Sequence, residues 1–399
     1  MGITNRIKLS CLGALFCYFL IGSSLVNVQA QTLRVATFNA YLNRAKQGEL
    51  LQDLLAEKKS EQIASVAEII QRVRPDVLIL QEFDYDDEGR ALALFEEKYL
   101  AKSQNGAEAI DYPYFYIPET NTGYPSGEDF DNDGKIEGGG DAFGFGVFPG
   151  QYGFAIFSKY PIDNQNIRSF QKFLWKDMPD ANLPVNPETN ESYYSEAALN
   201  VFRLSSKNHV DLPVDVNGKT LHVIVAHPTP PVFDAEEDKN GKRNHDEIRL
   251  ITDYINNADY LYDDKGVKGG LESGEYFVIG GDMNADPNDG DTYDHAIRKL
   301  LEDKKVNAAV IEGTKIPKSK GGVVNTKLSD NEQMKAQISE PKYDTSDWGL
   351  RVDYLIPSAN INIKKSGIFW PASGKKLSYL TDNNASSDHR LVWLDIELK

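Results

Sequence analysis

Residues 276–287 read Tyr-Phe-Val-Ile-Gly-Gly-Asp-Met-Asn-Ala-Asp-Pro, and this stretch decides the fold. Its apolar start predicts a short buried strand, which the Gly-Gly pair and Pro287 terminate. Side chains at positions i and i+2 of a strand point the same way, so we expect Asp282 and Asn284 to face one cleft. A carboxylate beside an amide suits the activation of water. On this segment alone, an Asx-rich turn is the simpler interpretation.

The segments near the start of the chain predict a strand, a helix and a second strand. Residues 33–40 alternate in polarity as a strand does and include Asn39 near their end. Apolar residues recur at helical spacing over residues 61–73, and Arg74-Pro75 stops that helix. The apolar run 76–82 then indicates a buried strand that ends on Glu82. Strand, helix and strand in this order form the first unit of an α/β layer.

The remaining elements are predicted from the same patterns. Strands are expected at 151–158, 196–204, 219–226, 276–280, 351–357 and 391–398, and helices at 246–256 and 294–301. Residues 303–349 are polar and rich in turn formers, so we expect a loop or insertion there. The chain contains no internal repeat and no obvious linker, which favours one domain over residues 31–399.

The first thirty residues have the pattern of a cleavable secretory signal peptide. Two basic residues precede the apolar run Leu12–Val26, and Val28-Gln29-Ala30 supplies small residues for cleavage. Both cysteines, Cys11 and Cys17, lie inside this segment. The processed protein is therefore expected in the periplasm or outside the cell, without disulfides and without an integral membrane segment. Its stability must come from its core and from bound metal.

The chain is strongly acidic. Its formal net charge is −17 at pH 7, and removal of the basic leader makes it more acidic still. Such a charge gives no general attraction to polyanions, which disfavours long nucleic acids as partners. Divalent cations bound at a site would reverse the field locally, so phosphate esters remain compatible with this composition.

Polar residues gather at the ends of the predicted strands in a recognisable order. The motifs are Thr37-Phe38-Asn39, Leu80-Gln81-Glu82, Gly281-Asp282-Met283-Asn284, Arg351-Val352-Asp353-Tyr354 and Ser387-Asp388-His389. A single motif of this kind is weak, but all five in this order resemble the endonuclease/exonuclease/phosphatase superfamily over the whole processed chain. The resemblance implies an α/β (α+β) fold, a four-layer αββα sandwich in which two packed mixed sheets are flanked by helices. The site would lie at one end, where strand termini converge.

The resemblance also implies a metal site built from oxygen ligands. Glu82 corresponds to the main ligand of a Mg²⁺ or Mn²⁺ ion, and Asn39 and Asp388 correspond to further ligands. Hard divalent cations of this type prefer oxygen donors. We therefore expect these three side chains around one ion or two.

Five further residues take catalytic roles by the same resemblance. Asp282 corresponds to the residue that orients or deprotonates the attacking water, and Asn284 to its helper. His389 corresponds to a phosphate-contacting histidine whose tautomer Asp353 fixes. Whether Asp282 or the Asp353–His389 pair is the general base stays open. His227, after the strand at 219–226, is expected to stabilise transition-state charge or to protonate the leaving group.

Two further candidate sites stand beside this set. Arg243 and His245 are expected at the start of the helix over 246–256, where backbone N–H groups could bind phosphate; a capped surface helix is an equal alternative.

Residues 129–137 have the Asp-x-Asp-x-Asp-Gly spacing of a calcium loop. Asp129, Asp131 and Asp133 would supply ligands, and Glu137 or Asp141 would replace the usual final Glu. We expect a structural Ca²⁺ in this acidic insertion, near residues 119–150.

These observations predict a secreted, divalent-metal-dependent phosphoesterase that hydrolyses phosphate mono- or diesters. The acidic charge favours a small molecule or nucleotide as substrate and a monomeric enzyme. An extracellular endo- or exonuclease is the alternative, and a non-catalytic calcium-binding interaction protein is a remote one. No apolar loop of the kind that docks a sphingomyelinase on membranes is recognisable in the sequence.

Overall fold

The computed structural model describes residues 31–399, which form one compact unit. The predicted signal peptide, residues 1–30, lies outside the described residues. Among the described helices, none is long and apolar enough to cross a membrane.

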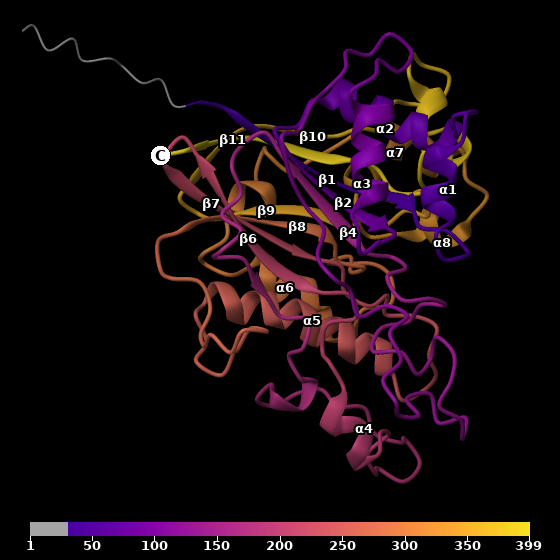
Figure 1. Cartoon of the computed structure of the whole chain (residues 1–399), viewed down its shortest axis with the longest axis vertical. Helices are drawn as coiled ribbons and strands as arrows, with labels where there is room; N and C mark the ends of the chain where they lie inside the picture. Colours follow the sequence, from indigo (N-terminus) through magenta and orange to yellow (C-terminus); the bar gives the residue numbers. More distant parts are fainter. Residues whose placement is uncertain (1–30) are drawn as a thin grey trace, which may run out of the picture. The chain divides into compact units, whose positions relative to one another are not determined.

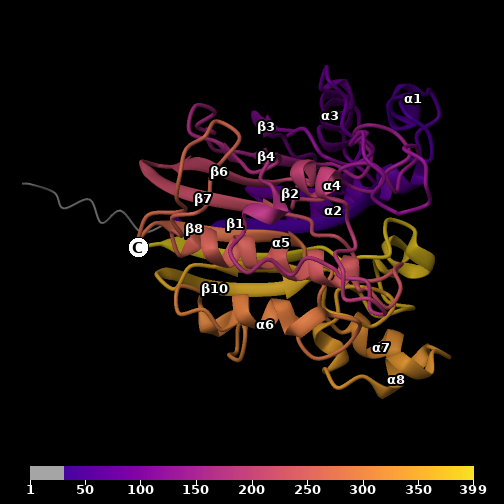
Figure 2. The same cartoon turned by 90° about the horizontal axis from the view of Figure 1, so that it is seen from below.

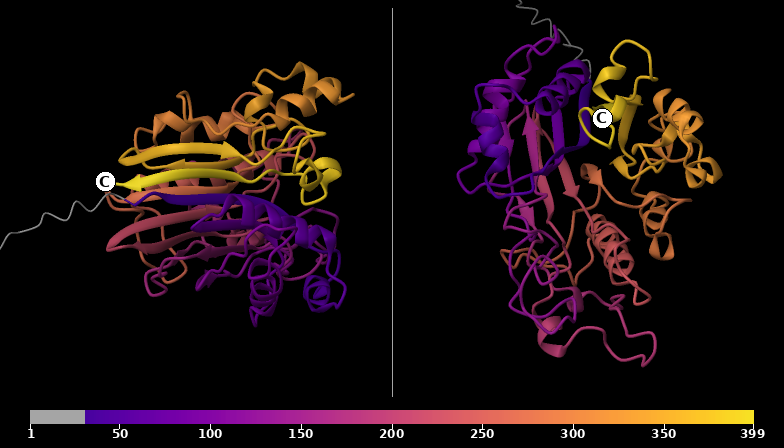
Figure 3. Two further views of the ribbon diagram at one scale, coloured as in Figure 1. Left: turned by 90° about the horizontal axis from the view of Figure 1, so that it is seen from above. Right: turned by 90° about the vertical axis from the view of Figure 1, so that its right-hand side faces the viewer.

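Two mixed sheets form the centre of the molecule (Figure 1). The larger sheet has the order β10-β11-β1-β2-β4-β3, with bounds Ile361–Ile368, Val392–Leu398, Leu33–Leu42, Val77–Phe83, Phe154–Ser158 and Tyr114–Tyr116. The smaller has the order β5-β6-β7-β8-β9, with bounds Arg168–Ser169, His209–Val216, Lys219–Ala226, Tyr276–Asp282 and Asp353–Pro357. The pairs β1–β2 and β7–β8 are parallel, and the other pairs are antiparallel. Figure 3 shows β10 and β11, in yellow, side by side at the edge of the larger sheet.

Helices cover the outer face of each sheet. The helices α1 (Glu49–Leu55), α2 (Glu61–Val73) and α3 (Arg90–Phe95) lie against the larger sheet, whereas α5 (Lys239–Ile255) and α6 (Ala296–Leu301) lie against the smaller. Figure 2 views the molecule from the α5 side. The short helices α4 (Glu196–Val201), α7 (Gly321–Leu328) and α8 (Glu332–Ala336) belong to the connecting segments.

Three apolar layers hold these elements together. The alternation of β1 places Phe38 toward the helices, while Val35 faces the second sheet. In β8, Val278 faces the first sheet, and its neighbours Phe277 and Ile279 face α5 and α6. One apolar layer thus lies between the two sheets, and one lies under each group of helices. The predicted four-layer αββα sandwich is confirmed.

Several element predictions need correction. The strand expected at 196–204 is wrong, because Ser195 accepts a hydrogen bond from the backbone N–H of Ala198 and so starts α4. The helix expected from Asp246 begins earlier, at Lys239. The segment 303–349, expected as a loop, contains α7 and α8. The strands β6 and β10 were not predicted.

Candidate active site

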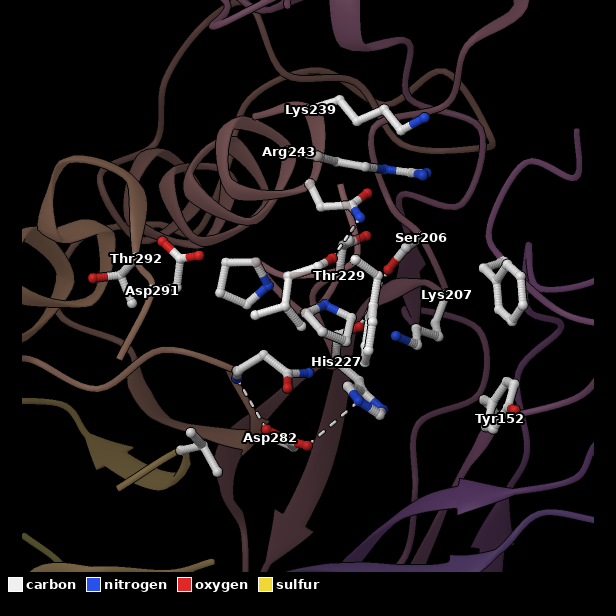
Figure 4. Close-up of a pocket in the computed structure, with 18 of the residues that line it drawn as sticks. Tyr152, Ser206, Lys207, His227, Thr229, Lys239, Arg243, Asp282, Asp291 and Thr292 are labelled. Atoms are coloured by element: carbon white, nitrogen blue, oxygen red, sulfur yellow. Dashed lines mark hydrogen bonds and ion pairs between the residues drawn. The ribbon is translucent and has the colours of Figure 1, made fainter. Parts of the chain in front are cut away.

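The topology brings the predicted site residues to one end of both sheets. Asn39 and Glu82 lie at the carboxyl ends of the parallel strands β1 and β2, and Asp282 ends β8. His227 follows β7, which is parallel to β8. The antiparallel strands β9 and β11 start at this same end, so Asp353 pairs in register with Asp282. Glu82, His227, Asp282, Asp388 and His389 are far apart in the sequence but line one cavity of about 960 Å³ (Figure 4). Asn39 and Asp353 are not on its wall; they contact Asp282 and His389, which are.

Irregular backbone geometry at the ends of β1 and β2 orients the side chains of Asn39 and Glu82. The β1–β2 register shifts between Asn39 and Leu42, and Glu82 has a φ of 57°, in the left-handed region. Such a conformation costs a non-glycine residue about 1–3 kcal/mol and is typical of functional sites. The Asn39 amide then donates hydrogen bonds to both Glu82 Oε1 and Asp282 Oδ2, each at 3.1 Å. In this orientation Asn39 links the two carboxylates.

The Asp282 carboxylate lies between two histidines of the site. Its Oδ2 lies 3.5 Å from His227 Nε2 and 3.6 Å from His389 Nε2, and its Oδ1 accepts the backbone N–H of Asn284. A Cβ at Gly281 would lie 1.9 Å from the carbonyl oxygen of Ala226, so only glycine allows β8 to approach β7 here. This close approach brings Asp282 next to His227. Burial raises the pKa of Asp282, and His389 opposes that effect.

Asp353 and His389 form a buried ion pair. Nδ1 of His389 donates to Asp353 Oδ2 at 2.9 Å. Burial alone lowers the pKa of His389, but the nearby carboxylates of Asp353 and Asp282 outweigh it and raise that pKa to about 10. Trp348 packs edge-on against this imidazole, with ring centroids 4.9 Å apart. The ion pair with Asp353 thus favours the charged imidazolium form of His389, whose Nε2 lies 3.6 Å from Asp282 Oδ2.

His227 and Lys207 line the same cavity as Asp282, and His227 lies directly beside Asp282 (Figure 4). Burial, together with the positive charges of Lys207 and His389, holds the pKa of His227 well below its usual range. The ring is thus neutral, so it can donate a hydrogen bond but carries no charge. Burial also lowers the pKa of Lys207, while Glu247, Glu82 and Asp282 favour its charged form. Lys207 therefore adds a basic side chain to the cavity wall beside His227, and the role expected of His227 stays a prediction.

The predicted ligands fit a hard divalent cation. Glu82 and Asp388 are oxygen donors on the cavity wall, and burial raises the pKa of Glu82. The charge of His389 and the neutral amides of Asn39 and Asn43 stabilise the Glu82 carboxylate, but burial outweighs them. A cation beside Glu82 would offset the free-energy cost of burying its negative charge. Asp282, Asp353 and His389 also place ligand atoms within 4.8 Å of one another, but His389 already balances those carboxylates.

A buried carboxylate on α5 connects the two loops that carry His227 and Lys207. Glu247 is fully buried and accepts the backbone N–H groups of Ser206 and Thr229, each at 2.6 Å. The neighbouring residue Asn244 donates to the carbonyls of Thr229 and Met283. Sequence reasoning missed Lys207, Glu247 and Asn244. The available signal was a run of charged residues on the buried face of an amphipathic helix.

Arg243 and His245 do not form the expected phosphate site. They lie in the second turn of α5, where the helix uses the backbone N–H groups. The guanidinium of Arg243 lines the cavity but donates to the carbonyls of Phe143, Arg203 and Leu204. His245 contacts Asp246, Asn182 and Lys299 and is absent from the cavity wall. The early start of α5 therefore removes the basis of this prediction.

The acidic insertion forms a carboxylate cluster beside the cavity. Asp129, Asp131, Asp133 and Asp141 place oxygens within 4.8 Å of one another. One oxygen of Asp129 is buried and has no hydrogen-bond partner. Glu137 is exposed beside Lys135, so the structure places Asp141 in the cluster and leaves Glu137 outside it.

Comparison with known protein families gives one extensive match. The model of the Endonuclease/Exonuclease/phosphatase family matches residues 36–389, which include every residue of the site described above. No curated protein sequence matched the chain.

Among solved structures, the chain is similar to several proteins at low identity. One is an endonuclease/exonuclease/phosphatase from Beutenbergia cavernae, with 14% identity, a TM-score of 0.49, and 92% of this chain and 72% of that chain covered. A family protein from Leptotrichia buccalis has 15% identity, a TM-score of 0.46 and coverages of 92% and 100%. Truncated TDP2 from Caenorhabditis elegans has 15% identity, a TM-score of 0.44 and coverages of 92% and 97%.

Proposed function

Because the chain belongs to the endonuclease/exonuclease/phosphatase family, whose members are metal-dependent phosphoric ester hydrolases, we propose that it is a secreted phosphoesterase. It would hydrolyse phosphate mono- or diesters by direct attack of water on phosphorus, using Mg²⁺ or Mn²⁺. The observation that carries this proposal is the position of Asp282, which faces two histidines inside a cavity that also presents Glu82 and Asp388.

Glu82 and Asp388 would hold the ion, with Asn39 beside them. When bound, a divalent cation polarises a phosphoryl oxygen and stabilises developing negative charge. Asp282 accepts the proton of the attacking water, because burial raises its pKa and so makes this carboxylate a stronger base, while the charge of His389 opposes that shift. The side chain of Asn284 donates to the carbonyl of Pro228, which fixes it at the cavity wall next to Asp282. Of the two candidates for the general base, we take Asp282, because it faces the cavity whereas Asp353 is not on the cavity wall.

Positive charge and N–H groups surround the place where the phosphoryl group would lie. His389 and Lys207 supply positive charge, and His227 supplies an N–H group. Preorganised donors of this kind stabilise the transition state more than the ground state. No covalent enzyme intermediate is needed, because a carboxylate base and a water suffice.

The proposal is tested by turnover of a panel of phosphate esters with Mg²⁺, Mn²⁺, Ca²⁺ and EDTA. EDTA should abolish activity, and Mg²⁺ or Mn²⁺ should restore it. Asp282→Asn should lower kcat about 10²- to 10⁴-fold, the usual contribution of a general base. Asp259→Asn, at an exposed position outside the cavity, is the matched control. A nearly unchanged rate in Asp282→Asn would refute the assignment.

Secretion is part of the same proposal, and it rests on the sequence pattern of residues 1–30. Expression of the full chain in a bacterial host, followed by mass spectrometry of the exported protein, should give a species that begins near Gln31. Retention of the complete chain in the cytoplasm would contradict it.

A structural calcium ion in the acidic insertion is a separate assignment. Its support is the cluster of four aspartates together with the buried, unpartnered oxygen of Asp129. Calcium at 100 times its Kd should stabilise the fold by about 2.7 kcal/mol. Asp131→Ala should lose that gain in thermal unfolding. A parent protein whose Tm is insensitive to Ca²⁺ would count against the site.

A further inference from the structure

Two large apolar side chains are exposed at the cavity that holds Asp282. Phe233 is 90% exposed and Phe145 is 64% exposed, yet both line this cavity. They come from separate loops, one after His227 and one in the acidic insertion. Phe233 also has a φ of 66°, in the left-handed region. Exposed apolar groups that gather at a concave site indicate a binding surface.

A rigid aromatic wall continues this surface into the protein. Phe130, Tyr194 and Phe202 also line the cavity and are buried. The Phe202 ring centroid lies 4.4 Å from that of Phe130 and 4.7 Å from that of Tyr194. A cavity of about 960 Å³ is far larger than one phosphate group needs and falls in the range of pockets for whole organic ligands. Aromatic rings thus form one part of the wall around the extra space.

The charges on the wall exclude a second phosphate from this region. Among the described residues that line the cavity, the cations are Lys207, Lys239, Arg243 and His389, and His389 belongs to the catalytic end. Lys207 belongs to the catalytic end, and Arg243 donates to three carbonyls. Lys239 contacts the hydroxyl of Tyr193 and lies 4.0 Å from Glu237. Asp289 and Asp291 add negative charge to the wall, which would repel a polyphosphate or a nucleic acid strand.

We propose that this cavity binds a phosphate ester whose organic group is uncharged and apolar or aromatic, and that Phe145 and Phe233 cover that group. The inference rests on the proposed phosphoesterase function and names its substrate class. The phosphoryl group lies between Lys207, His227 and His389, and the organic group extends along the rings toward the mouth.

Two diesters with the same leaving group test the proposal. Methyl 4-nitrophenyl phosphate and phenyl 4-nitrophenyl phosphate carry the same charge and release the same 4-nitrophenolate, so their KM values differ through the retained group. We expect kcat/KM to be at least about tenfold higher for the phenyl ester, since burial of one aromatic ring is worth at least that factor. Phe145→Ala and Phe233→Ala should each lower this preference about threefold or more, mainly through KM.

Phe115→Ala is the matched control, because Phe115 is 46% exposed on β3 and does not line the cavity. It should keep the preference of the parent. Titration calorimetry with phenylphosphonate and methylphosphonate, which are not esters, measures binding separately from turnover. Phenylphosphonate should bind more tightly to the parent, and Phe233→Ala should remove the difference.

The outcomes separate this inference from the proposed function. If the parent hydrolyses neither diester, nor any other ester of the panel, with Mg²⁺ or Mn²⁺, the phosphoesterase assignment fails. If it hydrolyses both with equal kcat/KM and binds phenylphosphonate no more tightly than methylphosphonate, the assignment stands and the inference on the organic group is overturned. Faster cleavage of an oligonucleotide, unaffected by Phe145→Ala and Phe233→Ala, would also overturn it. So would tight binding to phosphatidylcholine vesicles that is lost in Phe233→Ala, since the rings would then contact a membrane.

Discussion

Replacement of Glu247 by Gln tests whether a side chain outside the cavity holds the catalytic end together. The Glu247 carboxylate is fully buried and accepts the backbone N–H groups of Ser206 and Thr229 at 2.6 Å each. Ser206 is next to Lys207 in the sequence, and Thr229 lies two positions after His227. The Glu247 carboxylate therefore connects the loop that carries Lys207 to the loop that carries His227.

The size of the effect follows from the hydrogen bonds. A glutamine keeps one acceptor oxygen, but its NH₂ group would face the second backbone N–H, donor against donor. One charge-assisted hydrogen bond is lost and one buried N–H is left unpaired, which costs about 2–4 kcal/mol of unfolding free energy. Displacement of the loops by about 1 Å would lower kcat/KM on the order of 10²-fold.

The assays are urea unfolding monitored by tryptophan fluorescence and turnover of a nitrophenyl phosphodiester at saturating Mg²⁺. Glu272→Gln removes the same charge at an exposed position and serves as control. Equal stability and equal kcat/KM in Glu247→Gln and the parent would refute the reasoning. A loss of stability with unchanged turnover of the folded protein would show that the connection supports the fold and does not position the site.

Three further predictions follow from the geometry. Lys207→Met should lower kcat/KM about 10- to 100-fold in a steady-state assay, and Lys207→Arg should recover part of it, because the buried cation offsets phosphoryl charge. Asp353→Asn should lower kcat about 10²-fold with unchanged circular dichroism, because His389 loses the partner that fixes its proton. Burial raises the pKa of Asp344 to about 7, so the native state binds the proton more tightly and unfolding free energy falls as pH rises from about 4 to 7. Asp344→Asn should flatten this profile in urea titrations and be more stable than the parent above pH 7, on the order of a few kcal/mol.

The fold was predictable where burial makes the sequence pattern simple. Strand β2 is buried on both faces, so residues 77–80 are all apolar. Helix α2 has its apolar face and its Ser60 cap in the local sequence, and its bounds match the prediction. Strand β6 escaped prediction because Asp211 and Pro213 interrupt its pattern. The Asp211 carboxylate is tolerated there because His222 and Tyr254, both distant in sequence, pair with it.

The site residues also fall into two groups, those recognisable in the sequence and those that only the folded structure identifies. Asn39, Glu82, Asp282 and Asp388 come at the ends of strands or in short motifs, so their chemistry is visible in a linear sequence. The roles of Lys207 and Glu247 depend on contacts between segments that meet only in the folded chain. The phosphate site expected at Arg243 failed for a local reason, since residues 239–245 already belong to α5.

This division explains why the reaction could be predicted better than the substrate. Backbone hydrogen bonds of two sheets fix the catalytic end, and their register places Asp353 opposite Asp282 without help from any loop. The part of the cavity that would hold the organic group comes from the acidic insertion and from the segment after His227, which have no sheet to define them. Exchange of these two loops between family members should therefore change KM and substrate preference while kcat for a minimal ester stays within about tenfold. A collapse of kcat for methyl 4-nitrophenyl phosphate in such a chimera, with the fold intact, would show that the loops also position Asp282 and His389.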